Sequence, residues 1–208
     1  MADWVTISAL ATAGGTLALA GATFVSTQSS NRNARIAEVA LRQQLRPVLM
    51  NSHLDDPEQK IMFFGGHWVR VPGSGAVVEY QDDIVYMSLS LRNVGSGIAE
   101  LLGWYLIPEF DQTTGRQDPA PPEQFRSQTR DLWIPAGGIG LWQGALRDNS
   151  EEIHAQMREI TEQPRPFLID LLYNDHLGGQ RAVSRFTVNP RPDGHWLCAV
   201  TRHWQIDA

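Results

Sequence analysis

The chain has 208 residues, of which 42% are apolar and 19% are charged, a composition typical of a folded protein rather than a disordered one. Its net charge of −6 is uneven: residues 27–50 carry four arginines against Glu38 alone, whereas residues 51–208 carry 13 basic and 21 acidic side chains, a net charge of −8. Because an acidic domain repels phosphate backbones, these values argue against a nucleic-acid-binding protein.

The first predicted element is a transmembrane helix within residues 1–26. No residue from Val5 to Ser26 is charged, and a helix of this length spans roughly 30 Å, the thickness of a hydrocarbon core. Trp4 precedes the segment, where an interfacial indole is common. A cleaved signal peptide, a buried soluble helix and a helix inside a larger membrane complex are the alternatives. The lack of a basic residue before the apolar stretch disfavours the signal peptide.

Small residues at i, i+4 spacing give this helix a face suited to close helix packing, formed by Gly14, Ala18 and Ala22. Several threonines and serines make the segment only marginally apolar for insertion alone. Such spacings also arise by chance in alanine-rich anchors, so a homo-oligomer through this helix, or packing against neighbouring spans, is one of two open interpretations. Asp3 precedes the span and four arginines follow it, so the positive-inside rule predicts a single-pass protein of the cell membrane with its N-terminus outside and its globular domain in the cytoplasm.

Residues 27–46 are predicted to form a basic helical stem. Helix-favouring residues extend from Ser30 to Leu45, and Pro47 should end the helix at or near Leu45. A dimerising stalk and a solvated linker whose arginines touch anionic headgroups both remain open. The linker is favoured because the segment is shorter than three heptads.

Hydrophobic alternation with period two begins after Pro47 and predicts a β-rich domain over residues 47–208. The clearest strand is Ile84 to Arg92, where apolar residues alternate with polar ones such as Ser88 and Ser90. This pattern is typical of a half-buried antiparallel strand. Further strands are expected at residues 48–50, 61–64, 68–71, 98–107, 130–134, 139–146, 167–173, 182–188 and 196–206.

One helix is predicted in the domain, over residues 149–162, with Asn149 or Ser150 as its N-cap. Ile153, Met157 and Ile160 form its apolar stripe. Many short strands with a single helix indicate a mainly β fold, an antiparallel immunoglobulin-like β-sandwich with one inserted helix.

Three short motifs give the chain a likeness to other proteins: Leu45 to Leu49 (LRPVL), Leu89 to Glu100 (LSLRNVGSGIAE) and Leu172 to Gln180 (LYNDHLGGQ). With the N-terminal span, this layout resembles a loose group of bacterial single-pass membrane proteins of unassigned function. The resemblance implies a β-sandwich on a membrane tether and transfers no catalytic residue.

Motifs that carry chemistry are weak. Gly95 and Gly97 follow a strand and precede another, so they predict a turn with positive φ rather than a dinucleotide loop, which needs a helix next. Asp170, Asp175 and His176 are candidates for proton transfer or metal binding, although Asp175 and His176 fit ordinary turn chemistry. His53, Asp55 and Asp56 form a second polar cluster with no calcium-loop pattern.

No catalytic, cofactor or metal motif emerges. Cys198 is the only cysteine, which excludes an intramolecular disulfide and a thiolate zinc site. The sequence therefore argues against an enzyme and predicts no cofactor. The leading hypothesis is a membrane-tethered module that binds an unknown protein. The alternatives are a structural subunit of a larger membrane assembly and, less favoured, a ligand-binding or hydrolytic domain.

Overall fold

The computed structural model describes residues 4–110 and 117–207, and within the first helix the side chains at 4–11, 18 and 42 lie outside the description. The chain divides into two compact units, Met1–Gln44 and Leu45–Ala208. The first unit holds one continuous helix, α1 (Trp4–Gln44), which joins the predicted span and stem without a break. It ends shortly before Pro47, as the proline predicted.

The described side chains of α1 are exposed, including large apolar ones. Leu17 is 75% exposed, Leu19 70% and Phe24 71%, and Leu19 lies on the opposite side of the helix from Leu17 and Phe24. Within the described part of the chain, no helix combines the length and the apolarity that crossing a bilayer requires.

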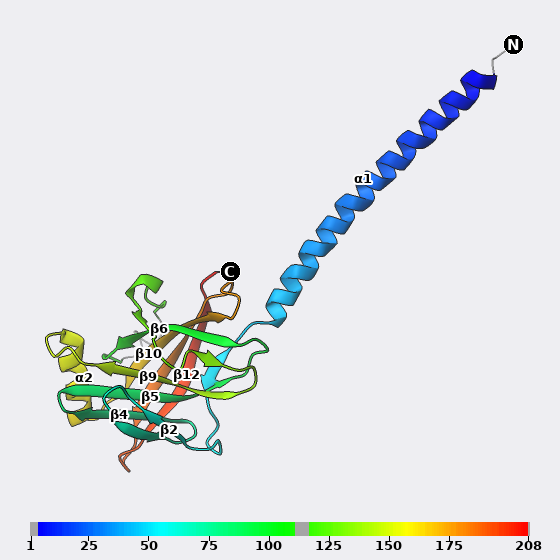
Figure 1. Ribbon diagram of the computed structural model, residues 1–208. Helices are drawn as coiled ribbons and strands as arrows, with labels where there is room; N and C mark the ends of the chain where they lie inside the picture. The colour runs from blue at the N-terminus through cyan, green and yellow to red at the C-terminus, as the bar shows by residue number, and fades with distance from the viewer. Residues whose placement is uncertain (1–3, 111–116, 208) are drawn as a thin grey trace. The chain divides into compact units, whose positions relative to one another are not determined.

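The second unit is mainly β and antiparallel, which confirms the predicted class (Figure 1). One sheet has ten strands, and a separate hairpin, β2–β3, has two. The strands are β1 (Leu49–Asn51), β2 (Gln59–Met62), β3 (Trp68–Val71), β4 (Gly75–Gln81), β5 (Ile84–Asn93), β6 (Ala99–Ile107), β7 (Arg126–Ser127), β8 (Trp133–Ile134), β9 (Ile139–Leu146), β10 (Phe167–Asp175), β11 (Ala182–Pro190) and β12 (Trp196–Gln205). A short 3₁₀ turn, η2 (Pro122–Gln124), precedes β7.

The large sheet has two halves. In one half β5 pairs with β9 along one edge and with β4 and β1 along the other. In the other half the order is β12-β11-β10-β6, with β7 and β8 both on the outer edge of β6. The halves are joined where β4 pairs with β12, through Ala76–Trp196 and Gly75–Leu197. The sheet does not close into a barrel, and β9 and β7 border the opening.

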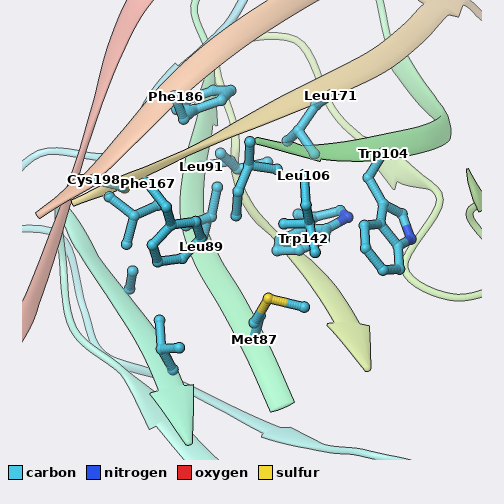
Figure 2. Packing of buried hydrophobic residues seen from close by; sticks show 14 of the residues in the cluster. Met87, Leu89, Leu91, Trp104, Leu106, Trp142, Phe167, Leu171, Phe186 and Cys198 are labelled. Atoms are coloured by element: carbon cyan, nitrogen blue, oxygen red, sulfur yellow. The ribbon is translucent and has the colours of Figure 1, made fainter. Parts of the chain in front are cut away.

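Both halves contribute side chains to one core (Figure 2). Met87 and Leu89 come from β5, while Leu171 and Phe186 come from β10 and β11. Helix α2 (Glu152–Glu162) adds Met157 and Ile160 to the same core, as its apolar stripe predicted. The immunoglobulin-like arrangement remains a prediction.

A second, smaller core lies under the β2–β3 hairpin. It contains Phe63, Val71, Val77 and Tyr86 among its buried members. Because the hairpin covers the outer face of β5, the prediction that β5 is half-buried is wrong. Ser88 and Ser90 on that face are fully buried.

Two further local predictions fail for identifiable reasons. β4 was not predicted, because its first four residues are all buried and do not alternate. The N-cap of α2 is Glu151 without a side-chain bond, since the Ser150 hydroxyl donates instead to Asp148 Oδ1 (2.6 Å).

Candidate functional site

The structure does not bring Asp170, Asp175 and His176 together. Asp170 lies on the outer face of β10 and is fully buried against Arg185, whose Nε and Nη2 donate to its two carboxylate oxygens at 2.6 and 2.7 Å. Burial raises the pKa of Asp170 and the Arg185 guanidinium opposes that rise. Trp204 covers the guanidinium at 4.8 Å from the ring centroid. The pair is therefore enclosed and holds two strands together.

Asp175 and His176 serve the turn after β10. The Asp175 carboxylate accepts a hydrogen bond from the Gly179 N–H (2.8 Å), and His176 is exposed. Five residues separate Asp175 from Asp170, which places them on opposite faces of the strand. In the other predicted cluster, Asp56 binds Arg92 (2.5 Å), and that hydrogen bond is the main reason its pKa is lowered. The described residues contain no group of three or more metal-ligating side chains.

The helix-packing residues fall partly outside the description. An added Cβ at Gly14 would meet no atom within 4 Å, and Ala22 is exposed. The side chain of Ala18 lies outside the described residues. The predicted packing face therefore stays a prediction.

Two of the short motifs, Leu89–Glu100 and Leu172–Gln180, meet around the third, Leu45–Leu49, which we call the entry segment. Asn93 is the hub: its Oδ1 accepts from the N–H groups of Val48 (3.1 Å) and Gly95 (3.0 Å). Its Nδ2 donates to the carbonyl oxygens of Gly97 and Ile134. All four hydrogen-bonding positions of a buried amide are thus filled.

Gly95 and Gly97 do not have positive φ, so that prediction is wrong. Their backbone instead lies against the entry segment. A Cβ at Gly97 would stand 1.6 Å from the Leu45 carbonyl oxygen, and one at Gly95 would stand 2.3 Å from that of Arg46. Close backbone approach, rather than turn geometry, requires glycine at both positions.

The third motif closes the other side of the entry segment. The Tyr173 hydroxyl accepts from the Leu49 N–H (3.2 Å), and the Ser184 hydroxyl donates to the Leu49 carbonyl (3.1 Å). His203 Nδ1 lies 3.2 Å from the Tyr173 hydroxyl, and Arg46 Nε donates to Gln180 Oε1 (3.0 Å). Ser184 is fully buried and already bonded, so this cluster is not an arrangement for nucleophilic attack.

Cys198 offers no reactive thiol. It is 2% exposed, and burial raises its pKa to about 12. A thiol in this state is inert, because the thiolate is the nucleophile.

A different region has the character of a contact surface. Large apolar side chains of the β2–β3 hairpin point into solvent, and we call them the hairpin face: Met62 (42% exposed), Phe64 (73%) and Trp68 (54%). Gly65 and Gly66 have positive φ and form the turn that joins β2 to β3. Exposed aromatic and methionine side chains grouped on one element are a mark of interaction surfaces.

A shallow pocket of about 190 Å³ lies beside the hairpin face, at the open edge between β9 and β7. We call it the Trp104 pocket; it is lined by Phe63, Phe64, Trp104, Ser127, Gln128, Thr129, Arg130, Gln143, Gly144, Ala145 and Arg147. Trp104 packs edge-to-face on Trp142 at 5.5 Å (Figure 2). A Cβ at Gly144 would stand 2.6 Å from the ring of Trp142 on the same strand and 3.3 Å from the Trp104 ring, so glycine there leaves room for both indoles.

Two exposed arginines line the Trp104 pocket. Arg147 Nη2 donates to the Phe64 carbonyl (2.8 Å), and its guanidinium lies 5.8 Å from the Phe64 ring. Arg130 Nη1 donates to the Met62 carbonyl (3.4 Å). Other arginines of the domain bind carboxylates instead: Arg70, Arg92, Arg126, Arg158, Arg165, Arg181, Arg185 and Arg191. Among the described residues, neither Arg130 nor Arg147 forms an ion pair.

No protein-family model matches this sequence, and no curated protein matches it either. The function must therefore be argued from the geometry. The hairpin face and the Trp104 pocket combine aromatic area with available cations, which suits binding and provides no catalytic group.

Sequence reasoning missed this site. Its residues come from four separate stretches, and only one left a local signal. Two aromatics precede Gly65-Gly66 and a third follows at Trp68, more apolar surface than a two-stranded hairpin needs for its own packing. That excess was the available clue.

Proposed function

We propose that this chain is a membrane-tethered interaction module, in which the N-terminal helix holds the β domain at the bilayer and the hairpin face binds another protein. The observation that carries the proposal is the hairpin face itself. Phe64 is 73% exposed and Trp68 54%, and both stand on one hairpin with Met62, whereas the other exposed aromatics of the β domain, Phe110 and Trp133, come from separate stretches of the chain. Aromatic side chains of this kind supply most of the energy at protein interfaces.

The tether is supported by the sequence and by the exposure of α1. Residues 5–26 carry no charge, and the described apolar side chains of the helix are exposed. A helix that is apolar on all sides requires an apolar environment. Because many of its residues are small or hydroxylic, we propose that it lies in the membrane packed against other helices rather than alone. By the positive-inside rule, the four arginines after it favour a cytoplasmic position for the β domain.

The experiment is purification of the full chain from native membranes in mild detergent, comparing variants of matched exposure. Trp68→Ser should lose a stoichiometric partner that the parent chain retains. Trp133→Ser is the control, since Trp133 is also 54% exposed. It lines neither the Trp104 pocket nor the adjacent pocket that Met62 and Trp68 line. Equal retention by both variants, or a partnerless parent chain, would remove the proposal.

A structural subunit of a larger membrane assembly is the second candidate, favoured by the open space around Gly14. In that case Gly14→Leu and Ala18→Leu should release the chain from its complex, because bulky side chains prevent close helix approach. Trp68→Ser should then have no effect. The two candidates therefore respond to different substitutions.

A further inference from the structure

The Trp104 pocket has the features of a site for one extended strand of a partner. β9 pairs with β5 along one edge, and within the described residues no strand pairs with its other edge at 143–146. An unpaired edge presents backbone N–H and C=O groups that an incoming strand can use.

One side chain already occupies part of that edge. Gln128 Nε2 donates to the carbonyl oxygens of Gln143 (3.1 Å) and Arg130 (2.8 Å), across the opening between the sheet halves. The bond shows that the Gln143 carbonyl points away from β5. Residue 145 shares its parity, so its backbone groups point the same way.

The volume of the pocket fits a single side chain. At about 190 Å³ it is smaller than the roughly 300–1,000 Å³ of most small-molecule sites. Its lining includes Trp104, which is 5% exposed, and Phe64, which is 73% exposed. An apolar side chain of an extended segment would contact aromatic surface there.

The charge of the pocket indicates which charged residues the bound segment carries. Each of Arg130 and Arg147 uses an N–H on a backbone carbonyl and retains further donors of its guanidinium. Nearby carboxylates are already bonded: Asp131 accepts from Gln143, and Asp148 from Ser150. The two available guanidinium groups make this pocket locally positive, which selects for carboxylates.

We infer that the Trp104 pocket binds an extended acidic peptide segment that pairs with the free edge of β9 and inserts one apolar side chain between the two arginines. This inference rests on the proposed function, because it gives the chemistry of the partner segment. A nucleic acid is disfavoured by the net charge of the domain.

The test uses the full chain in mild detergent and a fluorescent peptide of about ten residues, a common strand length, that alternates Glu with Val and carries one central Phe. Anisotropy should show saturable binding to the parent chain. Arg130→Glu with Arg147→Glu should weaken it by about tenfold or more, since two charge-assisted bonds are lost. The same variant should gain affinity for a peptide that alternates Lys with Val. Arg191→Glu, on the exposed β11–β12 turn, is the matched control and should bind as the parent does.

A second probe separates strand pairing from simple charge attraction. The acidic peptide N-methylated along one edge keeps its charge but cannot donate to β9, so its binding should fall by about tenfold. Equal binding of methylated and unmethylated peptide, or of acidic and basic peptide, would overturn the inference. So would binding of vesicles with anionic lipid in its place.

Failure of this inference and failure of the proposed function give different results. If the acidic peptide fails to bind while Trp68→Ser still loses its native partner, this inference falls and the interaction module stands. If Trp68→Ser retains the partner, the module itself falls.

Discussion

The entry segment and the Trp104 pocket differ in whether their polar side chains already have partners within the domain. Around the entry segment every described polar group of Asn93 is bonded, and glycines bring backbones into contact. At the hairpin face and the Trp104 pocket beside it, Phe64 and Trp68 are exposed to solvent, and Arg130 and Arg147 have no carboxylate partner among the described residues. Polar groups that are all satisfied fix a structure, whereas groups left available bind something else. The contrast separates what this domain needs for folding from what it offers to a partner.

The largest effect should come from Gly97→Ala. Its Cβ would stand 1.6 Å from the Leu45 carbonyl oxygen, so backbone must move and the Asn93 network must break. We expect the free energy of unfolding to fall by about 3 kcal/mol in urea titration. Gly179→Ala is the control, because nothing lies within 4 Å of its Cβ; it should change stability by less than about 0.5 kcal/mol. Equal effects would show that close packing at the entry segment is unimportant.

Tyr173→Phe should have a smaller effect. It removes a hydroxyl bonded to the Leu49 N–H and to Ser184, leaving a buried N–H without that acceptor. A loss of about 1–2 kcal/mol in the free energy of unfolding is expected, measured by urea titration with partner binding as a second readout. Binding should be unchanged, since Tyr173 contacts the entry segment and does not line the Trp104 pocket. A binding defect without a stability defect would reverse the assigned roles.

Acid should weaken the same network slightly. The pKa of His203 is lowered from its ordinary 6.5, first by burial and then by Arg46. The folded state therefore holds fewer protons than the unfolded state, so the stabilisation is complete above pH 6.5 and is lost as pH falls below it. Stability curves of the parent and His203→Gln should differ in slope below pH 6.5 and run parallel above it. Curves parallel throughout would remove His203 from the account.

The smallest effect on stability should come from the hairpin face. Phe64→Ser removes a side chain that is 73% exposed, so the free energy of unfolding should change by no more than about 0.5 kcal/mol in either direction. Partner binding should nevertheless be lost. A marked loss of stability would mean that Phe64 belongs to the fold rather than to the contact surface.

Local pattern predicted much of the fold. Alternation located β5 and β9 closely, and the Ile153, Met157 and Ile160 stripe located α2. It failed at β4, where burial on both faces removes alternation. The same alternation predicted an exposed face at Ser88, but the separate β2–β3 hairpin covers that face of β5. Periodicity reports how one strand is exposed, and only the tertiary fold decides what covers the other side.

The candidate site was less predictable. The roles of Gly95 and Gly97 depend on Leu45 and Arg46, about fifty residues earlier, and no local rule distinguishes close approach from positive φ. Likewise, Arg130 and Arg147 meet Phe64 only after the sheet folds. The polar residues adjacent in sequence, Asp170, Asp175 and His176, drew attention but separate onto different faces.

Photo-crosslinking in native membranes tests the central claim most directly. A photoreactive amino acid would replace Phe64 in one full-length chain and Trp133 in another. The account predicts one adduct of defined mass from position 64 and none from position 133, although both side chains are exposed. Adducts of equal yield at both positions, or none at position 64, would contradict the claim that the hairpin face binds a protein partner.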